Sequence, residues 1–212
     1  MKRFRGRVEA GDLLGEFLVS EVGTVDDGIV LGLPRGGVPV AARVAVKLDL
    51  PLDVFIVRKL GMPGHEEYAM GAIASGGVMV LNDQAVKGAG ITEVAIQSVA
   101  DRELVELERR ERLYRGDKPP LEVAGRDVIL VDDGIATGST IRAAIEAIRI
   151  NQASSVTVAV PVAPRSAEKE IGPLVDRYFA LRTPTPFSAV GWWYQDFTQT
   201  TDDEVRSLLT GL

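Results

Sequence analysis

The residues with the clearest capacity for chemistry lie between Asp132 and Thr140, directly after the apolar run 128–131. Two adjacent carboxylates, Asp132 and Asp133 (the acidic pair), end that run, and the turn that follows is rich in glycine and hydroxyl side chains. Backbone N–H groups, hydroxyls and the N-terminus of a following helix can together bind a phosphate. The carboxylates suit either sugar hydroxyls or a hydrated divalent cation. A sugar phosphate would satisfy both halves of the motif.

Two further segments carry groups that bind anions. Pro34-Arg35-Gly36-Gly37 follows the apolar run 28–33 and places a guanidinium beside two residues that lack Cβ. Arg58-Lys59 follows the apolar run 52–57. Each segment is a weak signal alone, because glycine turns and basic strand ends are common in proteins. Their meaning depends on whether the fold brings them to the acidic pair.

The elements that must position these groups follow from apolar runs that alternate with helical periodicity. Alternating strands and helices predict an α/β fold with a twisted, mainly parallel five-stranded sheet and helices on both faces. Ligands in such sheets bind beyond the carboxyl ends of the strands, so we expect all three segments to line one crevice. The predicted strands cover 28–33, 52–57, 128–131, 155–162 and 177–181, and a hairpin is predicted around Gly76-Gly77. The predicted helices cover 10–19, 37–48, 92–114, a segment after 138, and 166–171.

Composition excludes several classes of protein. A chain of 212 residues with 46% hydrophobic residues fits one domain. The net charge of −6 argues against a nucleic-acid binder, and no apolar run approaches a membrane span. The chain has no cysteine and a single histidine, His65, which excludes disulfides, cysteine nucleophiles, histidine metal clusters and a serine–histidine triad. We expect a cytoplasmic protein whose chemistry depends on carboxylates, basic groups, backbone donors and a borrowed metal ion.

The stretch Val128–Ile141 closely resembles the 5-phosphoribosyl-1-pyrophosphate (PRPP) motif of type I phosphoribosyltransferases, in which two acidic residues and a glycine/threonine turn follow an apolar strand. The resemblance implies one such domain over residues 1–212. In that family the acidic pair holds the ribose hydroxyls, and the turn binds the 5′-phosphate. The implied phosphate-binding residues are Ile135, Ala136, Thr137, Gly138, Ser139 and Thr140.

The resemblance extends to the two basic segments, which correspond to the pyrophosphate side of the family's site. It implies that Arg35, Gly36, Gly37, Arg58 and Lys59 bind pyrophosphate. Catalytic roles would fall on Asp132, Asp133 and Lys59. Mg²⁺ would be held indirectly through PRPP, with Asp132, Asp133 or Asp196 as additional candidates for contact.

Two segments correspond to mobile or covering parts of the family's fold. Residues 59–72 match the position of its flexible catalytic loop, and residues 183–212 match its hood. The hood contains a cluster of aromatic residues that loosely resembles the base-binding segment of purine phosphoribosyltransferases. It has one extra residue between Gly191 and Asp196, so base binding by Trp192, Trp193 and Asp196 stays open against simple core packing.

The resemblance implies a glycosyltransferase that moves the 5-phosphoribosyl group from PRPP to a nitrogen acceptor, expected to be a nucleobase, with Mg²⁺ and release of pyrophosphate. Such chemistry serves nucleotide salvage, and family members commonly form homo-oligomers. The alternative is a regulatory protein that senses PRPP or nucleotides without catalysis. A nucleotide hydrolase is a third reading, but the chain lacks the Gly-x-x-x-x-Gly-Lys-Ser/Thr loop. The sequence does not identify the acceptor.

Overall fold

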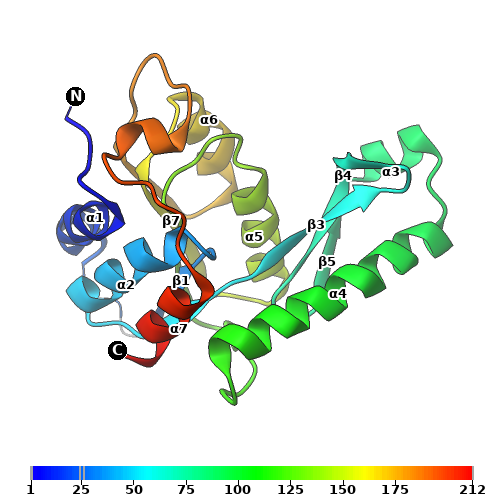
Figure 1. The fold of residues 1–212 in the computed structure, drawn as a ribbon, viewed down its shortest axis with the longest axis horizontal. Helices are drawn as coiled ribbons and strands as arrows, with labels where there is room; N and C mark the ends of the chain where they lie inside the picture. The colour runs from blue at the N-terminus through cyan, green and yellow to red at the C-terminus, as the bar shows by residue number, and fades with distance from the viewer. Residues whose placement is uncertain (1, 24, 26, 212) are drawn as a thin grey trace.

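The main sheet has five strands in the order β2-β1-β6-β7-β8, and every neighbouring pair is parallel. The computed structural model describes residues 2–23, 25 and 27–211 (Figure 1). The strands of this sheet are β1 (Gly28–Gly32), β2 (Leu52–Val54), β6 (Asp127–Val131), β7 (Ser155–Val162) and β8 (Arg177–Arg182). The predicted parallel α/β fold is therefore confirmed.

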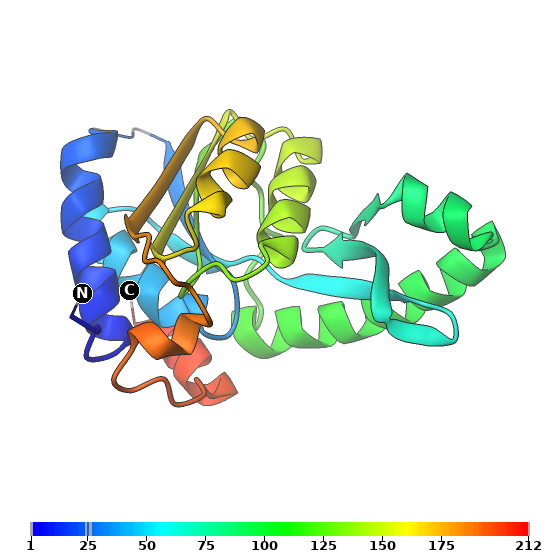
Figure 2. The same cartoon turned by 90° about the horizontal axis from the view of Figure 1, so that it is seen from above.

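Alternation along the strands builds two apolar layers, one on each face of the sheet. Val30, Ile129 and Val131 point to one layer, and Ile29, Leu31 and Leu130 point to the other. The first layer is covered by α1 (Arg7–Val22), α2 (Gly37–Leu48) and α7 (Asp202–Thr210), and the second by α5 (Ser139–Ile150) and α6 (Ser166–Ile171). Figure 2 shows the sheet between α1 and α2 on one side and α5 and α6 on the other. Both faces are buried along β1, β6 and β7, which explains why these strands are nearly continuous apolar runs.

A second, antiparallel sheet projects from the body, together with two helices (Figure 2). Its strands are β3 (Val57–Met62), β4 (His65–Ala74) and β5 (Val78–Leu81), and its helices are α3 (Asp83–Ala89) and α4 (Glu93–Arg115). Leu60 and Met70 of the hairpin are fully buried in one cluster with Ile96 and Leu107 of α4. This packing makes α4 the support of the projecting hairpin.

The hairpin corrects two expectations. The predicted strand over 52–57 is split, because β2 ends at Val54 and Val57 already belongs to β3. The chain leaves the parallel sheet where Ile56 N–H donates to Ser75 Oγ instead of to a neighbouring strand (3.0 Å). Residues 59–72, expected as a loop, lie mostly in β3 and β4 because Leu60 and Met70 gain a buried partner in α4. Whether this hairpin moves stays a prediction.

The hood is largely irregular and lies beside the N-terminal residues. Within it, a 3₁₀ helix covers Val190–Trp193, and a second 3₁₀ helix, Gly172–Leu174, follows α6 earlier in the chain. The helices α3 and α7 were not predicted. None of the helices formed by the described residues is long and apolar enough to span a membrane.

Candidate functional site

The acidic pair lies at the carboxyl end of the central strand β6, where both side chains are half-buried. Asp132 Oδ1 accepts a hydrogen bond from Asp133 N–H (2.8 Å), which fixes one oxygen of the first carboxylate. Burial raises the pKa of Asp132 well above the ordinary value of 3.8, and the neighbouring Asp133 raises it further. Burial also raises the pKa of Asp133, while Arg7 opposes that rise. Two adjacent carboxylates in a partly buried site are costly unless a cation or a polar ligand accompanies them.

That cation comes from Arg7, the first residue of α1, which sequence reasoning missed. Arg7 Nε and Nη2 lie 2.9 and 2.8 Å from Asp133 Oδ2. The guanidinium also donates from Nη1 to Thr198 O (2.7 Å) and lies 4.0 Å from the centre of the Phe197 ring. The contact joins residues 126 positions apart, so no local pattern in the sequence could have indicated it.

Tyr194 is the second contact to the acidic pair that the sequence did not reveal. Its hydroxyl donates to Asp133 O at 2.6 Å, and its ring is buried between Phe4 and Phe197. Burial raises the pKa of Tyr194, so the phenol stays protonated and remains a donor at neutral pH. Its membership in the aromatic cluster of the hood was the one available signal, and the sequence left that cluster open between base binding and packing.

The glycine loop after β1 lies directly against the acidic pair. A Cβ atom at position 36 would lie 2.1 Å from Asp133 Oδ2, and one at position 37 would lie 2.9 Å from Asp132 Oδ1. Only glycine permits this approach. The N–H of Gly37 already donates to Leu33 O (3.0 Å), so Gly37 contributes space and not a donor to the crevice.

Arg35, in the same loop, is directed toward the C-terminal helix. Its Nη1 lies 3.7 Å from Asp202 Oδ1, and about one third of its side chain (34%) is exposed. The same oxygen of Asp202 accepts a hydrogen bond from Tyr114 of α4 at 2.6 Å. Burial and this hydrogen bond raise the pKa of Tyr114 to about 12. A loosely held, partly exposed guanidinium remains able to turn toward an anion.

The turn between β6 and α5 is open to solvent at most of its predicted positions. Gly138 adopts a left-handed conformation (φ 73°) and caps α5, which begins at Ser139. Thr137 Oγ1 and Ser139 Oγ lie 3.2 Å apart, and Ala136, Thr137, Ser139 and Thr140 are exposed. Ile135 is the exception, because its side chain is buried and its N–H donates to Val162 O (2.9 Å). Ile135 therefore supports the turn and offers no donor.

The structure separates the basic pair Arg58-Lys59. Arg58 donates from Nη2 and Nε to Glu103 Oε2 of α4, at 2.6 and 3.0 Å. Lys59, on the opposite side of β3, lines a cavity of about 820 Å³ together with Ser139 and Thr140. Its Nζ donates to Glu67 O at 3.2 Å. Lys59 thus lines the same cavity as the start of α5, whereas Arg58 is held by the helix that supports the hairpin.

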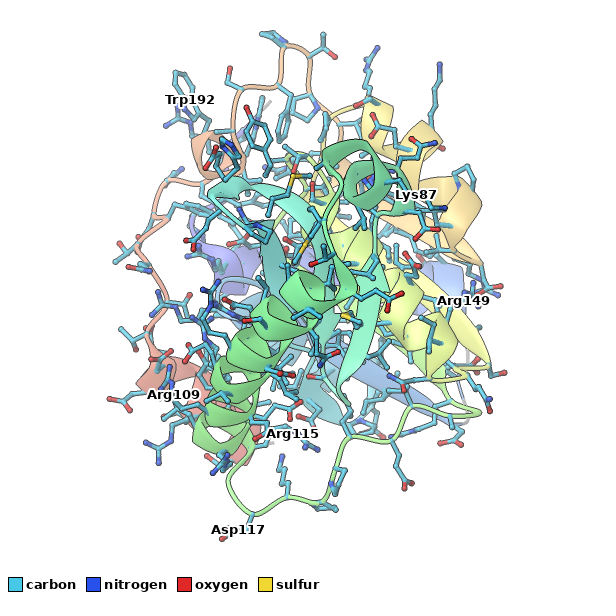
Figure 3. All side chains as sticks on the ribbon, turned by 90° about the vertical axis from the view of Figure 1, so that its right-hand side faces the viewer. Lys87, Arg109, Arg115, Asp117, Arg149 and Trp192 are labelled. Carbon is cyan, nitrogen blue, oxygen red and sulfur yellow. The ribbon has the colours of Figure 1, made fainter. Side chains whose placement is uncertain are left out.

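Among the described residues, Trp192, Trp193 and Asp196, the predicted base-side residues, form no hydrogen bond with the acidic pair. The hood residue that does is Tyr194. Trp192 is 64% exposed and lies at the rim of the molecule (Figure 3). Trp193 is half-buried and packs against the cluster around Phe4. Asp196 accepts hydrogen bonds from Thr198 N–H and Oγ1 (2.9 and 2.6 Å), which lower its pKa.

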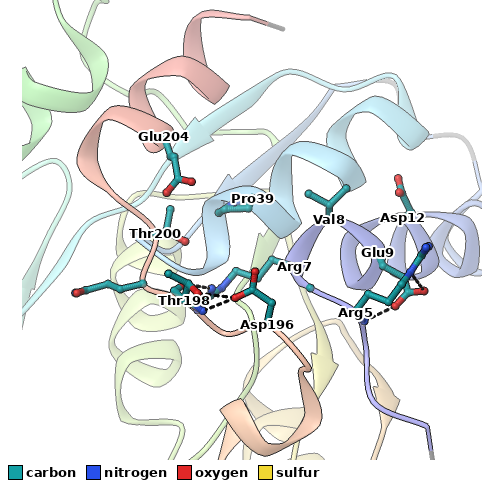
Figure 4. A pocket seen from close by; sticks show the side chains of 12 residues that line it. Arg5, Arg7, Val8, Glu9, Asp12, Pro39, Asp196, Thr198, Thr200 and Glu204 are labelled. Carbon is teal, nitrogen blue, oxygen red and sulfur yellow. Dashed lines mark hydrogen bonds and ion pairs between the residues drawn. The ribbon is translucent and has the colours of Figure 1, made fainter.

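A cavity of about 470 Å³ is lined by Asp196, Thr198 and Arg7, among other residues (Figure 4). Arg7 connects this cavity to the acidic pair, because the same guanidinium contacts Asp133. No group of three or more histidine, aspartate or glutamate side chains in the described ranges could hold a metal ion, and the chain has no cysteine. The residues present do not build a metal cage of their own.

The chain is similar to several known proteins. The chain matches the phosphoribosyl transferase domain over residues 13–194. The crystal structure of TT1426 from Thermus thermophilus is similar, with a TM-score of 0.87 and 41% sequence identity, and the match covers 99% of this chain and 98% of that one.

Two curated proteins from Mycobacterium tuberculosis, of strains CDC 1551 / Oshkosh and ATCC 25618 / H37Rv, are provisionally named phosphoribosyl transferases. Each is 44% identical over 209 residues, a match that covers 99% of this chain and 47% of the relative. The chain thus spans about half the length of these curated relatives. Because the family model matches most of the chain, this chain belongs to the phosphoribosyl transferase domain family.

Proposed function

We propose that the chain transfers the 5-phosphoribosyl group of PRPP to a nitrogen acceptor, expected to be a nucleobase, and releases pyrophosphate. One observation carries the proposal: the Gly36-Gly37 loop after β1 touches the acidic pair after the adjacent strand β6. A loop suited to pyrophosphate and a carboxylate pair suited to ribose hydroxyls are therefore close enough for one small molecule to reach both.

The acidic pair has the hydrogen-bonding capacity that a ribose needs. Asp132 uses Oδ1 on the backbone, and Asp133 uses Oδ2 on Arg7. No hydrogen bond from the described residues reaches Asp132 Oδ2 or Asp133 Oδ1. These two oxygens can accept hydrogen bonds from two ribose hydroxyls, while the turn from Ala136 to Thr140 takes the 5′-phosphate.

The reaction needs positioning and electrostatics more than a dedicated base. The bond from ribose C1 to pyrophosphate breaks with its electron pair leaving on the pyrophosphate, and the lone pair of the acceptor nitrogen forms the new bond to C1. Positive charge develops on the ribose ring and is stabilised by Asp132 and Asp133. Arg35 and Lys59 neutralise the departing oxygens, each after its side chain leaves its present partner, Asp202 or Glu67 O. When the acceptor nitrogen carries a hydrogen, its proton passes to the released pyrophosphate.

Mg²⁺ fits this site as an ion that arrives bound to PRPP. The protein supplies at most the two unbonded carboxylate oxygens of the acidic pair, and Mg²⁺ tolerates such a sparse protein contribution because it keeps waters and binds phosphates. When bound, the ion would neutralise pyrophosphate charge. Asp196 is a poorer candidate, since Thr198 already holds its carboxylate.

The second candidate function is a sensor of PRPP or nucleotides. It is favoured by the ion pair between Arg58 and Glu103, which removes one expected cation from the pyrophosphate side. A site that binds the donor but lacks a complete set of leaving-group cations would sense without turnover. Cytoplasmic location, a role in nucleotide salvage and self-association stay predictions.

The test combines binding and turnover on the same protein. Titration calorimetry with PRPP and Mg²⁺ measures donor binding, and pyrophosphate release is then assayed with purines, pyrimidines and other nitrogen acceptors. An enzyme binds PRPP and releases pyrophosphate with at least one acceptor class. Binding without release for every acceptor supports the sensor, and absence of PRPP binding contradicts both the transferase and a sensor of PRPP.

A further inference from the structure

Residues from both ends of the chain hold Asp133. Arg7 lies at the start of α1, and Tyr194 lies in the hood, yet both contact the same aspartate. The side chains of Arg7 and Asp133 are only 12% and 14% exposed, and Tyr194 is 2% exposed. Buried polar contacts of this kind are costly to form unless every partner is satisfied, so this arrangement is a built feature of the site.

The two contacts restrain different parts of Asp133. Arg7 binds one carboxylate oxygen, Oδ2, through two of its nitrogens, while the Tyr194 hydroxyl binds the main-chain carbonyl. Gly36 closes the remaining side, since even a methyl group there would collide with Oδ2. The backbone and one carboxylate oxygen are thus fixed, and Oδ1 is the oxygen left for a ligand.

Arg7 and Tyr194 are themselves held in place by the pairing of the two terminal segments. Phe4 N–H donates to Trp193 O (2.8 Å), and Gln195 N–H donates back to Phe4 O (2.7 Å). Arg7 is further tied to Thr198 O and to the Phe197 ring. The Tyr194 ring lies between Phe4 and Phe197, with ring centres 5.4 and 5.1 Å away. The terminal segments therefore form a rigid support for one side chain of the site.

We propose that Arg7 and Tyr194 are positioning residues, which orient Asp133 so that its Oδ1 meets a ribose hydroxyl of the donor. The inference rests on the proposed function, because it takes PRPP as the ligand. Arg7 engages only Oδ2 and leaves the second oxygen open, so it orients the carboxylate and does not block it. Its charge also offsets the repulsion between the adjacent carboxylates when a polyanionic donor arrives.

Three variants and one matched control test the proposal by titration calorimetry with PRPP and Mg²⁺. Arg7→Gln should weaken PRPP binding by about 10- to 100-fold, the loss expected for a charge-assisted hydrogen bond. Arg7→Lys should recover part of that loss, since it restores charge without the two-pronged geometry. Tyr194→Phe, which removes only a hydroxyl, should weaken binding by about 3- to 10-fold. Arg5→Gln breaks an exposed ion pair with Glu9 and should bind as the wild type does.

A double-mutant cycle separates positioning from a general structural effect. If Arg7 acts through Asp133, adding Arg7→Gln to Asp133→Asn should cause little further loss of PRPP affinity. For variants that turn over, the effect should appear mainly in KM for PRPP and only weakly in KM for the acceptor. Additive losses of PRPP affinity in the double mutant would overturn the proposal, and so would unchanged PRPP binding by Arg7→Gln. Tighter PRPP binding by Arg7→Gln would also overturn it, because Arg7 would then compete with the ligand for the carboxylate. Failure of the wild-type chain to bind PRPP would instead refute the proposed function, and this inference with it.

Discussion

The two sides of the crevice are held in different ways. On the ribose side, Asp133 is fixed by the nearly buried Arg7 and the buried Tyr194. On the hairpin side, the ion pair between Glu66 and Arg102 has an N–O distance of 3.8 Å, and its side chains are 75% and 59% exposed. Exposed pairs contribute about 0–1 kcal/mol, much less than buried charge-assisted contacts. The comparison indicates that buried polar contacts hold the side around Asp133, whereas the hairpin is held on α4 by the buried Leu60 and Met70 and gains little from its exposed ion pair.

The largest effect should come from removing single carboxylates of the acidic pair. Asp132→Asn and Asp133→Asn should each lower the rate of phosphoribosyl transfer by about 100-fold or more, because each loses a charge that stabilises the developing cation. Their stabilities should differ. Asp133→Asn leaves Arg7 without its anion and should cost about 2 kcal/mol, below the ~3–5 kcal/mol of a fully buried pair. Asp132→Asn should be as stable as the wild type or more so.

Turnover assays and urea unfolding of both variants test this contrast. Full activity in Asp132→Asn or Asp133→Asn would refute the role assigned to the acidic pair. Equal stability losses in the two variants would remove the distinction between a carboxylate held by Arg7 and one that is not.

The next largest loss of activity is expected when a side chain at position 36 displaces the glycine loop from the acidic pair. Gly36→Ala should lower kcat/KM by about 10- to 100-fold, since its Cβ would meet Asp133 Oδ2 and displace either the loop or the carboxylate. Gly88→Ala in α3 is the matched control, because its Cβ meets no atom within 4 Å. The control should keep full activity. Wild-type kinetics in Gly36→Ala would show that the contact is not needed.

These contacts also mark what the sequence could predict. The strands β1, β6 and β7 were predictable because each is a nearly continuous apolar run that is buried along most of its length. The turn before α5 was predictable because glycine, hydroxyl and carboxylate residues are adjacent in the chain. The helix α7 carried a recognisable signal that was missed, the capping box formed by Thr201 and Glu204. Local patterns therefore encode the sheet and half of the candidate site.

The other half depends on contacts between distant residues. Arg7 pairs with a partner 126 positions away and Arg58 with one 45 positions away, and a charge in the sequence does not specify its partner. The strand after Val54 was misplaced for a similar reason, because only packing on α4 decides that Leu60 and Met70 belong to a separate hairpin. The sequence assigned Arg58 and Lys59 the same role. Separating them requires knowing that they face opposite sides of β3.

The third prediction concerns the pH dependence of stability. The pKa of Asp132 is raised in the folded protein, so the folded state holds its proton more tightly than the unfolded chain does. Stability should therefore fall as pH rises from about 3.8, the ordinary value, through the raised folded pKa. Asp132→Asn should remove that part of the decline. Urea unfolding across pH 4 to 8 measures it, and an identical pH profile in the variant would contradict the assignment.

The smallest effect is expected on the hairpin side. Glu103→Gln removes the anion that neutralises Arg58 on α4, and the freed positive charge should tighten PRPP binding by about two- to fivefold, the range of a partly exposed ion pair. Glu108→Gln, which breaks an exposed pair with Arg112 on the same helix, serves as control and should change nothing. Weaker PRPP binding in Glu103→Gln would mean that the ion pair supports the hairpin in its binding position.

The central claim is that the acidic pair, the glycine loop and the turn between β6 and α5 form one PRPP site. The most direct test is a calorimetric titration of the wild-type chain and Asp132→Asn with PRPP in the presence of Mg²⁺. We predict one PRPP bound per chain in the wild type and much weaker binding in the variant, with the wild-type fold retained. Equal affinity in both proteins, or no binding to the wild type, would contradict the claim.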